Sequence, residues 1–278
     1  MPPEDTVLDK KRIQKLVDDP RFIPGIYNYC DRWCERCAFT LRCSNYALSE
    51  EQFADAGDLD LRHERFWEKL GEVFRVTLEM LQDEAERRGL DLEAVDMAAV
   101  VEAEEEIEVC ASNHECTRSA NAYSAQVEQW FDAAHALFTE EARELELKFQ
   151  LDLPGSNPVE EAAKLGDTVD VIRWYQDLIS VKLQRAIAGQ VEETEDTDTE
   201  YPKDSDGSAK VALIGMDRSI AAWGTMLREF PSEENRILAI LVHLQRLRRK
   251  TEEHFPAARS FVRPGFDEEP AASSACDG

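Results

Sequence analysis

The residues with the clearest chemical potential in this chain are four cysteines crowded into one short stretch near its amino end. They lie within YNYCDRWCERCAFTLRCSNY, residues 27–46, at the positions Cys30, Cys34, Cys37 and Cys43. Four cysteine thiolates satisfy either a tetrahedral zinc ion or a four-iron cluster. In a reducing compartment, clustered cysteines favour metal binding over structural disulfides. The stretch therefore predicts a metal centre with these four ligands.

The spacing of the cysteines bears on the choice of metal. Structural zinc sites usually combine two short Cys-x2-Cys turns, and only Cys34 and Cys37 form such a pair here. A cubane cluster presents separate iron atoms, so a single loop with unequal spacings can wrap around it. We therefore expect a 4Fe-4S iron-sulfur cluster with a role in electron transfer, redox sensing or structural support. Zinc in a stapled scaffold or adaptor without a redox role is the alternative, and free or redox-paired thiols are a third reading.

The segment from Cys34 to Tyr46 resembles the cluster loop of helix-hairpin-helix DNA glycosylases, which carries Cys-x2-Cys-x5-Cys after a fourth, upstream cysteine. Here the upstream gap is three residues rather than six. The resemblance implies a four-iron cluster in helical surroundings. It does not extend to glycosylase activity, because Leu153-Pro154-Gly155 lacks the next glycine of a DNA-gripping hairpin. The first three cysteines also show the Cys-x3-Cys-x2-Cys pattern of radical S-adenosylmethionine enzymes, but the sequence shows no strand pattern from which their barrel could be built.

Aromatic and basic side chains are interleaved with these cysteines. The aromatic rings are expected to pack the small module onto the rest of the protein, and they would also exclude water from a cluster. The arginines would either offset the charge of the thiolates or remain in solvent. These residues are Tyr27, Tyr29, Trp33, Phe39 and Tyr46, with Arg32, Arg36 and Arg42.

A second group of possible ligands is Cys110, His114 and Cys116. Two thiols and an imidazole this close could bind zinc, supply an outside ligand or form a reversible disulfide between helices. The simpler interpretation is that Asn113 ends a helix and Cys110 is a small buried hydrophobic residue.

Two acid-x2-His pairs form a third possibility, Asp60 with His63 and Asp132 with His135. Ferritin-like bundles bind two iron ions through Glu-x2-His motifs, so the pairs raise the alternative of a metal-handling bundle. Both acids are aspartates, however, and no inward-facing glutamates are clearly placed to complete such a set. We therefore favour the interpretation of the pairs as a helix cap and a surface histidine.

Two charged residues fall on apolar helix faces, Asp217 and Lys182. A charge on a core-facing stripe needs a partner. We expect an ion pair that fixes helix register, or a polar pocket between two helices. The cations Arg173, Lys182, Arg185 and Arg218 are candidate partners of Asp217 or of Asp170.

Helical periodicity runs through most of the chain, and no alternating strand pattern is visible. Apolar residues recur three and four apart, which predicts an all-α antiparallel multi-helix bundle with the cysteine-rich loop at its N-terminal end. The expected helices cover 61–88, a segment capped by Asp91, 120–149, 159–188 and 209–230, with a last helix after Pro231. The predicted domains are a metal-binding module at 1–58, a bundle core at 59–189, an acidic linker at 190–208, a helix pair at 209–255 and a disordered tail at 256–278.

The 278-residue chain carries a formal net charge of −26. Such a surface repels phosphate backbones and anionic lipids, so nucleic acid and membrane partners are not expected, whereas a basic protein partner remains possible. No apolar run is long enough to span a bilayer, and the first residues do not form a secretory signal, so we expect a cytoplasmic protein. No catalytic nucleophile set, phosphate loop or dinucleotide fingerprint is present, and the sequence leaves open whether the protein is an enzyme.

Overall fold

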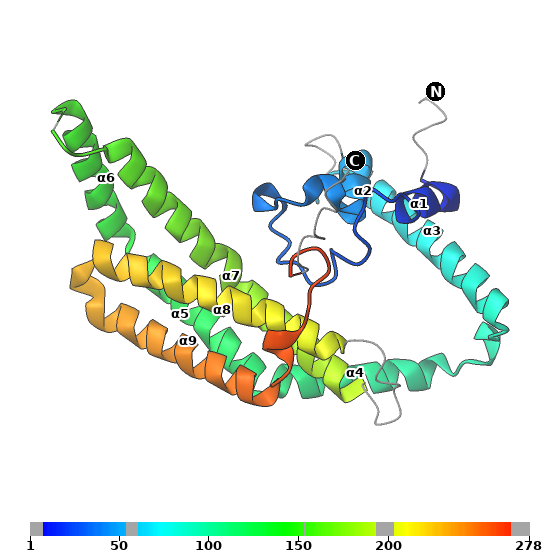
Figure 1. Cartoon of the computed structure of the whole chain (residues 1–278). Helices are drawn as coiled ribbons and strands as arrows, with labels where there is room; N and C mark the ends of the chain where they lie inside the picture. Colours follow the sequence, from blue (N-terminus) through cyan, green and yellow to red (C-terminus); the bar gives the residue numbers. More distant parts are fainter. Residues whose placement is uncertain (1–7, 54–60, 153, 193–202, 268–278) are drawn as a thin grey trace, which may run out of the picture. The chain divides into compact units, whose positions relative to one another are not determined.

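The computed structural model describes residues 8–53, 61–152, 154–192 and 203–267, and within them all regular structure is helical (Figure 1). The predicted all-α class is confirmed. The chain forms two compact units, one of residues 1–101 with 263–278 and one of residues 102–262. In the described residues no helix is both long enough and apolar enough to cross a membrane.

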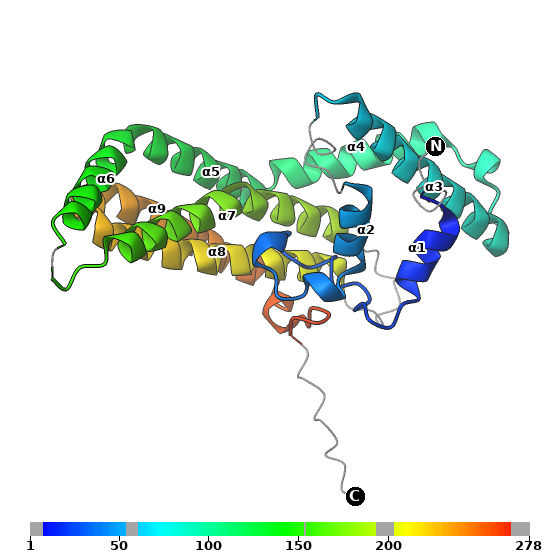
Figure 2. The ribbon, with the colours of Figure 1, turned by 90° about the horizontal axis from the view of Figure 1, so that it is seen from above.

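The larger unit is built on four long helices that pack side by side (Figures 1 and 2). They are α5 (Glu115–Ala133), α7 (Pro158–Glu192), α8 (Asp204–Glu229) and α9 (Glu234–His254). The closest approach is between α7 and α8, where a Cβ atom on Gly215 would lie 3.0 Å from Tyr175 and 3.1 Å from Ile179. Glycine therefore lets the two backbones come together.

The core of this unit is rich in aromatic rings and contains a few polar bonds. The indole of Trp223 donates a hydrogen bond to the hydroxyl of Tyr123 at 3.2 Å, and both side chains are fully buried. The imidazole of His243 joins α9 to α5, with its Nε2 2.8 Å from the carbonyl of Ser119 and its Nδ1 3.3 Å from the amide of Gln126. These contacts satisfy polar groups that burial would otherwise penalise.

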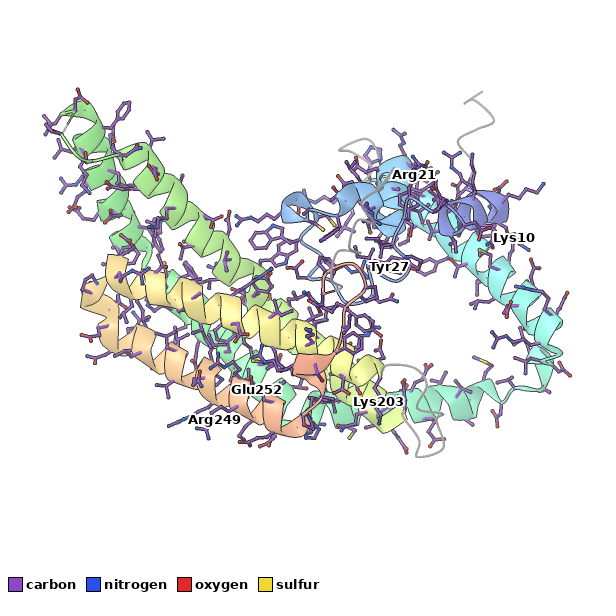
Figure 3. The ribbon with its side chains drawn as sticks, viewed as in Figure 1. Lys10, Arg21, Tyr27, Lys203, Arg249 and Glu252 are labelled. Carbon is purple, nitrogen blue, oxygen red and sulfur yellow. The ribbon has the colours of Figure 1, made fainter. Side chains whose placement is uncertain are left out.

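The smaller unit holds α1 (Lys10–Val17), α2 (Ser44–Gln52) and α3 (Glu64–Arg88). Lys10 on α1 (labelled in Figure 3) donates to Asp83 on α3 at 2.7 Å, and Val76 of α3 is fully buried. The opposite side of α3 is also apolar, yet its large side chains are 58–60% exposed: Trp67, Phe74, Leu78 and Leu81. Helix α3 thus carries large apolar side chains on two sides, and those of one side are exposed.

Several predicted helix boundaries are wrong. Helix α4 (Met97–Asn113) starts later than expected, because Asp96 rather than Asp91 accepts hydrogen bonds from the first backbone amides, at 3.1 and 3.3 Å. The predicted helix at 120–149 is two helices, α5 and α6 (His135–Gln150), which meet at Ala134. The break turns Phe138 back onto Trp130, with ring centroids 6.1 Å apart.

The predicted domain limits also differ from the units. Helix α3 belongs with the cysteine module rather than with the bundle. Helix α7 runs on to Glu192 and α8 begins at Asp204, so both enter the predicted linker, whose residues 193–202 lie outside the described residues. Part of the predicted disordered tail is folded: residues 258–260 form a short 3₁₀ turn and Phe261 is buried. Residues 268–278 lie outside the described residues.

Candidate metal centre

The cysteine loop is organised by two short 3₁₀ turns, η2 (Cys34–Arg36) and η3 (Thr40–Arg42). Each turn has a cysteine directly after it, whose backbone amide bonds back across the turn: Cys37 to the carbonyl of Cys34 at 3.1 Å, and Cys43 to that of Thr40 at 3.2 Å. Between the first two cysteines Arg32 adopts a left-handed backbone, with φ of 59°. Successive tight turns of this kind bend the loop back on itself.

All four predicted ligands line one small cavity of about 30 Å³. This volume corresponds to roughly two or three water-sized spheres. The cysteines are half-buried, and rings that the sequence had singled out share the lining: Tyr27 (labelled in Figure 3), Trp33, Phe39 and Tyr46. The structure therefore brings Cys30, Cys34, Cys37 and Cys43 together around a mainly aromatic cavity.

The sulfur atoms have polar contacts with the backbone. The amide of Phe39 donates to Sγ of Cys37, and the amide of Tyr46 donates to Sγ of Cys43, both at 3.4 Å. Burial raises the pKa of the Cys34 thiol, and the neighbouring thiols Cys30, Cys43 and Cys37 raise it further. The four sulfurs are thus within electrostatic range of one another.

A segment from the far end of the chain completes the cavity. Phe266 contributes to the lining and meets Phe39 edge-on, with ring centroids 5.0 Å apart. Gly265 has a φ of +74°, and a Cβ atom there would lie 2.9 Å from Cδ1 of Ile23 and 3.0 Å from Cδ1 of Ile26. Sequence reasoning missed this contact, because no local pattern connects residues so distant in the chain. The Pro264-Gly265 pair was the only available signal, and it marks a turn without naming its partner.

The donor set fits a thiolate-binding metal, since all four thiols face a shared cavity. No three Cys, His, Asp or Glu side chains of the described residues form a group that could hold a metal ion. Binding of any metal in this cavity therefore requires the thiols to adjust around it.

The second predicted group is only partly assembled. Cys116 is buried and Cys110 is exposed, which reverses the interpretation of Cys110 as the packed residue. Nδ1 of His114 accepts the backbone amide of Cys116 at 3.3 Å and so caps α5. The described cysteines form no disulfide, so the predicted reversible bridge is not formed. The ring of His114 faces that of His254, with ring centroids 4.6 Å apart. Burial lowers the pKa of His114, and the neighbouring His254 lowers it further.

The acid-x2-His pairs receive no support from the structure. His63 is exposed at the start of α3, and Asp60 lies outside the described residues. His135 is exposed at the start of α6, with its Nδ1 3.3 Å from the hydroxyl of Thr139. The two histidines belong to different units.

The partners predicted for Asp217 are wrong. Its carboxylate accepts hydrogen bonds from Arg248 at 2.9 Å and from Arg259 at 2.6 Å, and Arg259 also binds Glu252 (labelled in Figure 3) at 2.7 Å. The helix face of Asp217 is turned toward α9 and the segment after it, away from the cations of α7. Lys182 is buried on α7, as its place on the apolar face predicted.

The chain matches no protein-family model, no curated protein and no solved structure at the level that would indicate a relative.

Proposed function

We propose that the smaller unit carries a metal centre held by Cys30, Cys34, Cys37 and Cys43, and that this centre is a 4Fe-4S iron-sulfur cluster. The observation that carries the proposal is the single cavity lined by all four thiols. The unequal spacing of the cysteines supports a cluster, because separate iron atoms do not require the four sulfurs to converge on one point.

A cluster bound here would supply a one-electron redox centre, and the protein would determine its potential and its exposure. The backbone amides of Phe39 and Tyr46 already donate to two of the sulfurs, and such hydrogen bonds tune cluster potentials. The aromatic lining, together with Phe266, limits contact with water. These features suit electron transfer or redox sensing as well as structural support of the module, and a reducing cytoplasm would preserve the thiols.

Zinc is the second candidate, and the small volume of the cavity favours it. About 30 Å³ accommodates one ion more readily than an eight-atom core. In that case the site would staple the loop into a scaffold with no redox role.

Metal analysis of anaerobically purified protein tests the proposal. The expected result is about four iron atoms and four sulfides per chain, with a brown colour. Replacement of Cys34 or Cys37 with alanine should abolish the colour. The matched control is Cys110→Ala, which removes an exposed thiol outside the loop and should leave the iron content unchanged.

Other results would refute all or part of the proposal. If the protein instead bound one zinc ion per chain, and the same loop variants lost it, the cluster would be refuted and the zinc-stapled scaffold supported. Metal that persists in the loop variants, or no metal after reconstitution with iron and sulfide, would remove the metal centre altogether.

A further inference from the structure

The larger unit contains a second cavity that is separate from the cysteine loop. It has a volume of about 530 Å³ and lies between α6 and α7, with the end of α5 closing one side. Figures 1 and 2 show α6 and α7 side by side. Cavities that bind small molecules usually have volumes of about 300–1,000 Å³ and mostly apolar walls, and this one falls within that range.

The walls are aromatic and aliphatic. Phe131 and Phe138 stack with ring centroids 5.8 Å apart, and aliphatic side chains of α6 and α7 continue the surface: Leu145, Leu165 and Val169. The one cation of the lining, Arg173, lies over the ring of Phe131 at 4.1 Å and donates to Gln176 at 3.2 Å. The guanidinium of Arg173 thus already has partners within the cavity wall, Phe131 and Gln176.

The charge around the cavity is negative. Glu141 of α6 is half-buried in the lining, and three further glutamates act on it electrostatically from α6, α7 and α8: Glu144, Glu161 and Glu229. The nearby cation, Lys148, is bound to Glu161 at 3.1 Å. Burial raises the pKa of Glu141 and Glu144 raises it further, whereas Lys148 lowers it; the pKa is raised on balance, so additional positive charge beside this carboxylate would be favourable. A cationic ligand would supply that charge, and the net charge of −26 would help attract it.

We propose that this cavity binds a small organic cation, with its aromatic or aliphatic body against Phe138, Leu145 and Leu165 and its ammonium group facing Glu141. The volume lies within the range of small-molecule sites, and the lining is mostly apolar. The inference is independent of the metal centre, since every residue of the lining belongs to the larger unit.

Three probes of matched shape test the charge requirement on the full-length protein. They are 4-phenylbutylammonium, 4-phenylbutan-1-ol and 4-phenylbutyrate, titrated by calorimetry at low salt. The ammonium compound should bind tightest and the carboxylate weakest. Glu141→Gln should weaken binding of the ammonium probe by about fivefold to tenfold, because it removes one partly screened ion pair, and it should leave binding of the alcohol unchanged.

A filling variant tests the location. Gly166 lines the cavity, and a Cβ atom there would have no neighbour within 4 Å, so Gly166→Leu places a side chain in open space without a clash. Binding of all three probes should weaken by more than about tenfold. Gly71→Leu on α3 is the matched control, since a Cβ atom there also meets nothing within 4 Å, and it should bind the probes as the wild type does. Both changes replace a helical glycine with a better helix former, so the thermal midpoint should not fall.

Three results would overturn the inference. The first is equal binding of the ammonium and carboxylate probes. The second is wild-type binding by the Gly166→Leu variant. The third is no measurable binding of the ammonium probe at millimolar concentration.

Discussion

Replacing Gly265 with alanine should loosen the C-terminal segment that borders the cysteine cavity, and it should do so more than the same change at Gly89 loosens α3. Both glycines have a left-handed backbone, with φ of +74° and +67°. A Cβ atom at Gly89 meets nothing within 4 Å, whereas one at Gly265 lies 2.9 and 3.0 Å from the Cδ1 atoms of Ile23 and Ile26. Comparison of the two variants therefore separates the free-energy cost of a left-handed alanine from the cost of displacing the isoleucine side chains.

The expected magnitude follows from these distances. Alanine in the left-handed region costs about 1–2 kcal/mol at either position. The gain from a less flexible unfolded chain, about 0.4–1 kcal/mol, is also common to both. Only Gly265→Ala also forces isoleucine side chains away from their rotamers, which costs about 0.5–1.5 kcal/mol for each one displaced. With both Ile23 and Ile26 displaced, the free energy of local opening should therefore fall by about 1–3 kcal/mol more in Gly265→Ala than in Gly89→Ala.

Amide hydrogen exchange with mass spectrometry measures this opening. The amide of Ile23 bonds to the carbonyl of Arg42 at 3.0 Å, so its peptide reports on the loop. In Gly265→Ala this peptide should exchange at least about fivefold faster than in the wild type, and in Gly89→Ala it should be unchanged. Unchanged protection of the loop in Gly265→Ala would refute the packing of residues 263–267 against it.

Three further predictions concern the larger unit. Burial raises the pKa of Tyr123 from 10.0 to about 12, so the free energy of unfolding should fall by roughly 2–3 kcal/mol as the pH rises from 10 to 12; Tyr123→Phe should remove this dependence in alkaline denaturation curves. Burial raises the pKa of the Asp217 carboxyl, but hydrogen bonds from Arg259 and Arg248 outweigh it and hold that pKa below 3.8. The stabilisation from Asp217 should therefore be complete above pH 3.8 and be lost at lower pH, and acid unfolding of Asp217→Asn should lack this component. Iodoacetamide should modify the exposed Cys110 well before the buried Cys116, whose thiol pKa is raised by burial; equal rates by peptide mapping would contradict the placement of the two thiols.

The helices were largely predictable because their apolar residues repeat with the helical period, which is a local property of the sequence. The first and last residues of these helices were less predictable. Asp91 and Asp96 are both acceptable caps, and only the backbone geometry decides between them. The break at Ala134 has no glycine or proline to mark it, and depends on the packing of Phe138 against Trp130.

Contacts between residues distant in the chain could not be predicted, because helical periodicity is a local property of the sequence. The cysteine cluster was visible because its four members lie close together in the chain, whereas Phe266 joins the cavity from the opposite end. Asp217 was recognised as a charge in need of a partner, but the choice between the arginines of α7 and Arg259 depends on how the helices are rotated. The cavity at Glu141 depends on how α6 packs against α7, which periodicity does not specify.

X-ray absorption on the anaerobically purified protein, recorded at the iron and zinc edges, tests the metal centre most directly. We predict iron surrounded by sulfur, with additional scattering from neighbouring iron atoms, and loss of this signal in Cys34→Ala. Zinc with four sulfur neighbours at about 2.3 Å would contradict the cluster. Iron bound only by oxygen or nitrogen would contradict ligation by the four cysteines.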